Sequence, residues 1–160
     1  MKKSSIIAVA IIYLVSIILV GFLGVRMKIY DEILYVENIV WDYSEYENKK
    51  GYKVIIPTEE EKQQGIDYDA KLKYAVIGDI QNLVIHIKCH VEPLNATTPK
   101  LAYYLDVTET TDVHLDVLDD NTANVTFNEG TTCYLTIKST DGKDVEYRIL
   151  FEMISLNFGF

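Results

Sequence analysis

The sequence predicts an all-β fold, a β-sandwich, preceded by one N-terminal transmembrane helix. Two observations support this prediction. Residues 6–25 form an unbroken run without a charged side chain. Beyond residue 71, short segments rich in β-branched and aromatic residues recur at a spacing of roughly ten residues, which is typical of sandwiches. No long amphipathic helical pattern interrupts these segments.

The apolar run at 6–25 has the length of a membrane-spanning helix. At about 1.5 Å per residue, a helix of this length reaches about 30 Å, the thickness of the bilayer hydrocarbon core. Lys2 and Lys3 precede the run, and by the positive-inside tendency they keep residues 1–5 in the cytoplasm. The sequence therefore predicts a single-pass protein of the cell membrane whose C-terminal domain is extracytoplasmic.

A cleaved secretory signal is the alternative explanation for this segment. Such a signal has the same basic start, but its apolar region is shorter and ends in small residues. Here Phe22, Leu23 and Val25 occupy the end of the run. An uncleaved signal-anchor is therefore favoured over a cleaved signal.

The chain beyond residue 25 is strongly acidic. It contains all 24 acidic residues but 13 of the 15 basic ones, which gives this part a net charge of −11. Such a field repels nucleic acid and anionic lipid head groups, so nucleic acid is excluded as a partner. About 135 residues are enough for one domain with a sizeable core.

Residues 26–71 are expected to form a juxtamembrane segment with additional strands and an insertion. β-branched and aromatic residues at 33–41 indicate one strand, and a second short strand is expected at 51–56. Thr58 and Glu61 have the spacing of a capping box, which predicts a single helical turn after the second strand.

From residue 72 onward the pattern is β throughout. Apolar residues occupy the odd positions of 83–91 and mostly polar ones the even positions, so one face of this strand is expected in the core. Asp141 and Gly142 predict a type I′ hairpin between the last two strands. The expected strands are residues 72–77, 83–91, 101–107, 113–118, 123–127, 131–138 and 145–153.

Several short motifs in this half resemble one known family. The relevant residues are Ile77-Gly78-Asp79, Asn82-Leu83, Val91-Glu92-Pro93-Leu94-Asn95-Ala96-Thr97-Thr98 and Gly130-Thr131-Thr132. Over about residues 72–153 the chain is similar to a bacterial immunoglobulin-like domain of the group 2 type. The tryptophan that this family has in the next strand is replaced by Tyr103 or Tyr104.

The resemblance implies an immunoglobulin-like β-sandwich over residues 72–160. It also implies that the strand near residues 34–41 supplies the first strand of the sandwich, with residues 42–71 as an insertion. Domains of this type are similar to spacers and adhesion modules of bacterial surfaces, and they bring no active site.

Cys89 and Cys133 are a candidate disulfide pair. Both are expected to point inward from their strands, and an exported domain can oxidise them. A bridge closing a loop of about 45 residues would stabilise the fold by about 4 kcal/mol. Two buried free thiols are the equal alternative, because no sequence rule brings the two strands face to face.

Asp116, Asp119 and Asp120 are the candidate metal ligands. They belong to an acidic series over residues 106–121, and hard oxygen ligands on sandwich loops can hold calcium. No EF-hand or repeat spacing accompanies them, so the alternative is a solvated acidic surface.

Catalytic groups are sparse. On a strand His86 and His90 lie about 13 Å apart, too far to share one metal ion. No serine or cysteine has a recognisable nucleophile motif around it. We therefore expect no enzyme and no cofactor other than calcium. The expected function is a structural or interaction module of the cell envelope that binds a protein or an envelope polymer. The alternative is a calcium-dependent ligand-binding or adhesion domain that uses the acidic loops.

Overall fold

The computed structural model describes residues 9, 11–19, 33–107 and 112–156. The chain divides into two compact units, Met1–Ile33 and Leu34–Phe160. In the first unit, residues 9 and 11–19 are helical, and their large apolar side chains are exposed. Among the described residues, no helix is both long enough and apolar enough to cross a membrane. Much of the span predicted at 6–25, and all of residues 1–5, lie outside the described residues.

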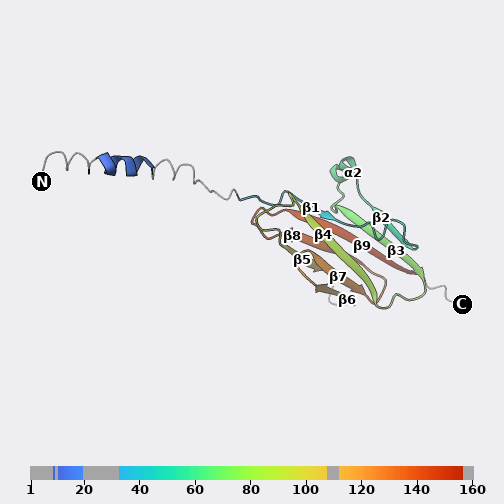
Figure 1. Ribbon diagram of the computed structural model, residues 1–160. Helices are drawn as coiled ribbons and strands as arrows, with labels where there is room; N and C mark the ends of the chain where they lie inside the picture. Colours follow the sequence, from blue (N-terminus) through green and yellow to red (C-terminus); the bar gives the residue numbers. More distant parts are fainter. Residues whose placement is uncertain (1–8, 10, 20–32, 108–111, 157–160) are drawn as a thin grey trace. The chain divides into compact units, whose positions relative to one another are not determined.

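The second unit consists of two β-sheets, as Figure 1 shows, and the all-β prediction is confirmed. The four-stranded sheet has the order β1 (Asn38–Trp41), β4 (Leu83–Glu92), β7 (Thr122–Phe127), β6 (Val113–Val117). The five-stranded sheet has the order β2 (Tyr52–Ile55), β3 (Ala70–Ile77), β9 (Glu146–Leu156), β8 (Thr132–Ser139), β5 (Leu101–Asp106). The strands expected at 33–41 and 51–56 are present as β1 and β2. One short helix, α2 (Glu59–Gln63), follows β2.

Neighbouring strands are antiparallel with one exception, the pair formed by β3 and β9. These two strands run parallel, from Ala70 opposite Ile149 to Ile77 opposite Leu156. The first long strand of the five-stranded sheet therefore lies beside the last strand of the chain.

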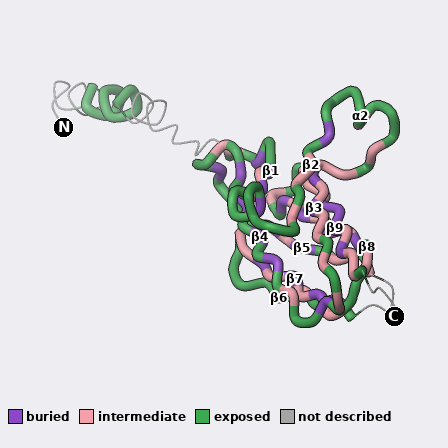
Figure 2. The backbone as a smooth tube through the Cα atoms, turned by 90° about the vertical axis from the view of Figure 1, so that its right-hand side faces the viewer, coloured by how far each residue is buried: buried purple, intermediate pink, exposed green. Residues whose placement is uncertain are grey.

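The core lies between the two sheets and follows the predicted alternation. In β4 the odd positions from Ile85 to Val91 are buried and the even ones are exposed. Across the core, Phe127 of β7 and Phe151 of β9 meet edge to face, with ring centroids 5.4 Å apart. Figure 2 shows buried and exposed residues alternating along the strands. Full burial of each such apolar side chain contributes about 1.5–3 kcal/mol, so this alternation fixes which face of each strand turns inward.

The segment between β2 and β3 projects from the sheets (Figure 2). It carries α2, whose first turn has the predicted capping box. The backbone N–H of Glu61 donates to Thr58 Oγ1 at 3.3 Å, and the backbone N–H of Thr58 donates to Glu61 Oε2 at 2.8 Å. At the base of the projection, the carboxylate of Asp69 accepts hydrogen bonds from Lys62 Nζ and from the backbone N–H of Arg148, both at 2.9 Å. The projection is therefore tied to β9.

Two loops hold the chain where it enters the sandwich. The backbone N–H of Leu34 donates to Thr97 Oγ1 at 3.0 Å, and the Thr97 N–H donates to the Leu34 carbonyl at 2.8 Å. The backbone N–H of Val36 donates to the carboxylate of Asp141. The loop around Asp141 differs from the predicted type I′ turn, because that turn needs a positive φ at both central residues and only Gly142 of this pair has one, of 88°. The Asp141 carboxylate also accepts hydrogen bonds from Ser139 Oγ and the Lys143 N–H, and these bonds stabilise the observed loop.

Candidate functional site

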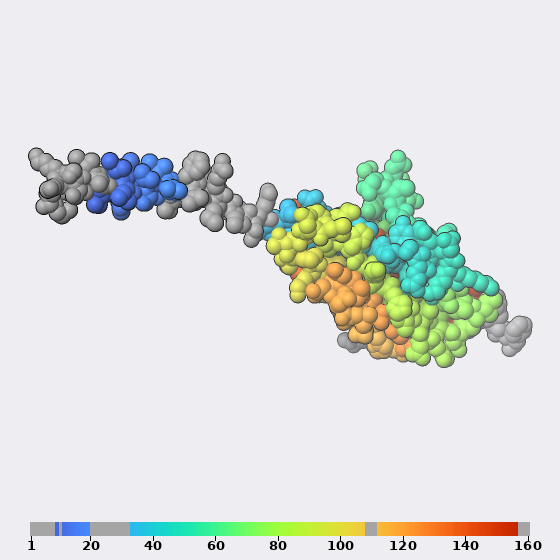
Figure 3. Space-filling model, in the orientation of Figure 1, coloured from blue at the N-terminus to red at the C-terminus, as the bar shows by residue number. Residues whose placement is uncertain are grey.

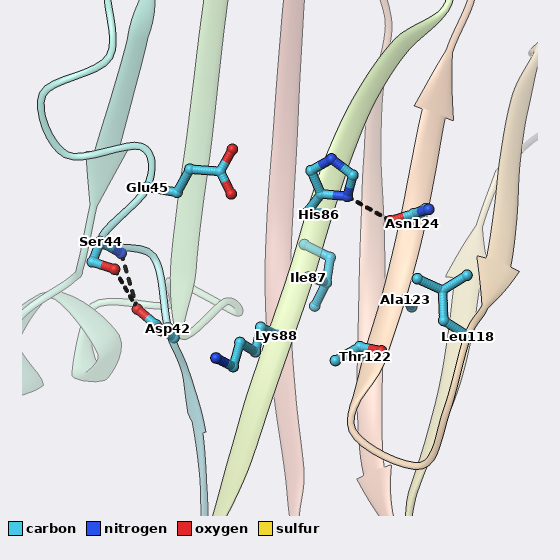
Figure 4. A pocket seen from close by; sticks show the side chains of 10 residues that line it. All are labelled: Asp42, Ser44, Glu45, His86, Ile87, Lys88, Leu118, Thr122, Ala123 and Asn124. Atoms are coloured by element: carbon cyan, nitrogen blue, oxygen red, sulfur yellow. Dashed lines mark hydrogen bonds between the residues drawn. The ribbon is translucent and has the colours of Figure 1, made fainter.

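A groove of about 390 Å³ lies on the outer face of the four-stranded sheet. Its walls come from the loop after β1, from β4, from the start of β7 and from the turn that precedes β7. Figure 4 shows how these side chains face the groove. Those with polar groups are Asp42, Ser44, Glu45, His86, Lys88, Thr122 and Asn124. Leu118, Ile87 and Ala123 add apolar surface.

The first wall is a tight turn that begins where β1 ends. The carboxylate of Asp42 accepts hydrogen bonds from the Ser44 hydroxyl at 2.7 Å and from the Ser44 N–H at 3.2 Å. These two bonds, and then the positive charge of Lys88 and His90, hold the pKa of Asp42 below its ordinary value. Asp42 is therefore ionised at neutral pH, with its orientation fixed.

Behind this wall the hydroxyl of Tyr46 takes the place of a strand partner for β4. The backbone N–H of His86 donates to Tyr46 Oη at 2.8 Å, and the Tyr46 hydroxyl donates to the His86 carbonyl at 3.2 Å. Burial raises the pKa of Tyr46 to about 12, so the hydroxyl keeps its proton and can fill both roles. Beyond the pairing of β1 with Cys89–Glu92, the Asp42 N–H donates to the Lys88 carbonyl at 2.8 Å. The Tyr46 hydroxyl then satisfies the next pair of backbone groups along β4, the N–H and the carbonyl of His86.

The floor of the groove is set by the His86 side chain. Its Nδ1 lies 2.7 Å from Asn124 Oδ1, an atom that can only accept a hydrogen bond. In the tautomer that carries its proton on Nδ1, this contact is a hydrogen bond to Asn124, and Nε2 is left as an acceptor. The strand register explains the contact, because His86 of β4 lies directly opposite Asn124 of β7.

The groove thus presents carboxylates, an ammonium group, an imidazole and an amide. The Ser44 hydroxyl donates to Asp42, and the His86 ring is bonded to Asn124. In the described part of the chain, the Ser44 hydroxyl and the His86 imidazole are therefore not hydrogen-bonded to each other as a nucleophile and its general base. The arrangement suits hydrogen bonding to a polar ligand.

An aromatic loop, residues 42–50, separates this groove from two further hollows. Its rings continue from the core to the edge of β2. Ring centroids are 5.7 Å apart for Trp41 and Tyr43, 6.2 Å for Trp41 and Tyr46, 5.3 Å for Tyr46 and Tyr52, and 4.5 Å for Tyr52 and Tyr74. Lys49 Nζ lies 5.2 Å from the Tyr46 ring and 5.0 Å from the Tyr52 ring. These contacts fix the loop between the two sheets.

The three carboxylates predicted as calcium ligands have different neighbours in the structure. Asp116 lies in β6 opposite Asn124. Asp119 accepts a hydrogen bond from the Asn121 N–H at 2.8 Å, and bonds from Asn121 and Thr122 lower its pKa. Asp120 forms an exposed ion pair with Lys100 at 3.4 Å. In the described part of the chain, no group of three His, Cys, Asp or Glu side chains is placed to hold a metal ion.

The two cysteines are buried free thiols in this structure. Cys89 lies in β4 opposite Trp41 of β1, and Cys133 lies in β8 opposite Phe151 of β9. Burial raises the pKa of each thiol to about 12. At neutral pH both are therefore protonated and weakly nucleophilic.

The sequence did not predict that the groove residues lie together. His86 was considered as a metal ligand only, although its outward position in β4 was predicted correctly. The signal that pointed to the groove is the set of polar residues at even positions of that strand. Asn124 and Asp42 have no local signal, because they join the groove through strand pairing and through the end of β1.

The chain was compared with known protein families, with curated proteins and with solved structures. No match was found in any of the three comparisons.

Proposed function

We propose that this chain is a membrane-anchored, extracytoplasmic interaction module of a bacterial cell envelope, built on an immunoglobulin-like β-sandwich. The observation that carries the proposal is the strand order. Immunoglobulin-like sandwiches place strands A, B, E and D in one sheet and C, F and G in the other. The order β1, β4, β7, β6 corresponds to the first set, and β5, β8, β9 to the second.

The membrane anchor is supported by the apolar N-terminal segment. Residues 6–25 contain no charged side chain, and Lys2 and Lys3 precede them. In the helical stretch 11–19, the large apolar side chains are exposed, and such a surface is stable only in an apolar environment. The lysines favour a cytoplasmic N-terminus and an exported sandwich.

Binding is favoured over catalysis by the chemistry of the groove. Asp42, His86 and Asn124 are hydrogen-bonded within the fold, so these side chains lose little conformational entropy when a ligand binds. Both signs of charge are present, in Lys88 and in the carboxylates of Asp42 and Glu45. Such a surface suits a protein or a polar envelope polymer, whereas the net charge of −11 beyond residue 25 disfavours nucleic acid.

Protease accessibility tests the location. The full chain with a C-terminal epitope is expressed in bacteria, and protease is added to intact cells, with the outer membrane permeabilised where one exists. We expect the epitope to be lost while a cytoplasmic reference protein survives. An epitope that is cleaved only after cell lysis would contradict the proposed topology.

Photo-crosslinking tests the interaction role. A photoreactive amino acid is placed at Glu45 in the groove wall and, as a matched control, at Glu60 of α2; both residues are exposed. We expect specific adducts in cells from position 45 and none, or different ones, from position 60. Identical adduct patterns from the two positions would argue against the groove as the binding surface.

A further inference from the structure

β2 is a free edge of the five-stranded sheet, because it pairs only with β3. The Ala75 N–H donates to the Gly51 carbonyl at 3.1 Å, which places the bonded pairs at the odd positions of β2. The backbone groups of Tyr52, Val54 and Ile56 therefore point away from β3. The Tyr52 N–H donates a hydrogen bond to the Lys49 carbonyl at 3.0 Å. No described residue forms a hydrogen bond with the N–H or carbonyl of Val54 or with the Ile56 N–H.

A groove of about 450 Å³ runs beside this free edge. The groove is lined by the apolar or aromatic side chains of Tyr43, Tyr52, Val54 and Ile56, of which Ile56 is 45% exposed. The polar side chains of Glu47, Asn48 and Lys53 complete the lining. Figure 3 shows this part of the chain, in cyan to teal, on the molecular surface. Open backbone groups, and a groove beside them that can receive alternate side chains, are the two features that an added strand requires.

The charges on the outer face indicate which side chains such a strand should carry. Lys53 of β2 lies directly opposite Lys73 of β3, and Lys73 lies opposite Glu152 of β9. Glu152 forms ion pairs with Lys71 and Lys73, but Lys53 forms none with any described residue. Like charges directly opposite each other destabilise a sheet. Across β9, β3 and β2, the side chains Glu152, Lys73 and Lys53 follow one another, and Lys53 at the free edge has no carboxylate opposite it. A carboxylate on the next strand would balance it.

We propose that β2 binds an extended segment of a partner protein as an additional strand, with apolar residues in the groove and an acidic residue beside Lys53. This rests on the proposed interaction function and adds to it a second binding surface, with the chemistry of the partner that would bind there. Side chains of an added strand alternate between the groove side, where Val54 points, and the outer face, where Lys53 points. The partner segment therefore alternates apolar and acidic residues. A second copy of β2 would bring another lysine to the same face and no carboxylate.

Peptide binding to the full chain in nonionic detergent tests this proposal. The probes are two rhodamine-labelled peptides, Thr-Val-Glu-Val-Glu-Val-Thr and the same sequence with Lys in place of Glu, and the readout is fluorescence anisotropy. We expect the acidic peptide to bind at least tenfold more tightly than the basic one. Lys53→Gln should reduce this preference to less than threefold.

Proline substitution tests the use of the strand edge. Val54→Pro removes an N–H that points away from β3, so the pairing with β3 is kept, and the acidic peptide should bind at least tenfold more weakly. Val117→Pro on the free edge of β6 is the matched control, because its N–H also points away from its neighbour strand, and binding should be unchanged. Thermal melting checks that both variants fold. If Val54→Pro does not fold, the Lys53→Gln result decides.

Three results would overturn the proposal: equal binding of the two peptides, wild-type binding by folded Val54→Pro, or loss of binding in Val117→Pro as well. The oligomeric state of the peptide-free chain, measured by sedimentation, gives a fourth such result. A dimer that Val54→Pro abolishes would assign the edge to a second copy. Because the protease and crosslinking experiments do not depend on β2, their success together with failure here would reject this inference alone.

Discussion

The carboxylate of Asp141 accepts a hydrogen bond from the backbone N–H of Val36, a residue 105 positions earlier in the chain. The same carboxylate accepts bonds from Ser139 and Lys143. Its burial raises the pKa, but the bonds from Val36, Lys143 and Ser139 outweigh this effect, and the pKa lies below its ordinary value of 3.8. The loop between β8 and β9 therefore fixes the point where the chain enters the sandwich.

Asp141→Ala should lower the free energy of unfolding by about 1–2 kcal/mol at pH 7, because it leaves the Val36 N–H without its acceptor. Since the folded-state pKa is depressed, the charge-dependent part of this stability is present above pH 4 and is lost as the pH falls through the folded-state pKa. Urea unfolding at pH 7 and at pH 3 measures both effects. Asp144→Asn is the control, with no change expected. An Asp141→Ala deficit that grows in acid would contradict this account.

Tyr46→Phe should destabilise the sandwich by about 1–3 kcal/mol, because it leaves both peptide groups of His86 without a partner while keeping the ring contacts. Chemical denaturation measures the loss, and amide hydrogen exchange at His86 should accelerate. Tyr104→Phe, at a tyrosine that is 56% exposed, is the matched control. Equal stability of the two variants would show that the hydroxyl bridge contributes little.

Tyr103→Phe, unlike Tyr46→Phe, should not lower the free energy of unfolding. Its hydroxyl is buried and bonds to no described residue, and burial, followed by the nearby Cys89, raises its pKa. Removing a buried hydroxyl without a partner should leave stability unchanged or raise it by about 1 kcal/mol. The melting temperatures of this variant and Tyr46→Phe, recorded side by side, provide the check. A Tyr103→Phe variant that melts clearly below wild type would indicate a partner for that hydroxyl.

The two thiols should be inert in the folded protein. With pKa values raised to about 12, neither Cys89 nor Cys133 should react with a thiol reagent at pH 8 on the timescale on which unfolded protein reacts completely. Thiol counts with and without urea test this, together with melting with and without reductant. We expect two reactive thiols per chain in urea, and the same melting temperature with and without reductant. A count below two in non-reducing urea would show that the cysteines form a bridge after export.

Calcium should not change the melting temperature. The carboxylate of Asp119 is bonded within its own turn, and Asp120 is paired with Lys100. Melts of the full chain in millimolar calcium and in chelator should therefore coincide. A rise of several degrees with calcium, abolished in Asp119→Asn, would restore the acidic turn as a ligand-binding site.

Local patterns predicted the strands well, and they failed where distant residues decide. The alternation in β4 and the capping box between Thr58 and Glu61 depend on neighbours within a few residues, and both were confirmed. The Asp141-Gly142 pair predicted a type I′ turn, but Asp141 lacks the positive φ of that turn, and its carboxylate accepts a bond from the distant Val36 N–H. The groove depends in the same way on Tyr46 reaching His86 where β1 stops. No periodicity in the sequence encodes that contact.

The parallel pairing of β3 with β9 has a mechanical consequence. The two strands are held together over eight residue pairs, from Ala70 with Ile149 to Ile77 with Leu156. In a parallel pair, a pull on the start of one strand and on the end of the other slides the strands along each other. The ladder bonds then share the load and break together, whereas in a hairpin pulled at its two ends they open one after another. Once β1 and β2 have been pulled away, tension between the N-terminal and C-terminal ends of the sandwich would therefore load this ladder in shear.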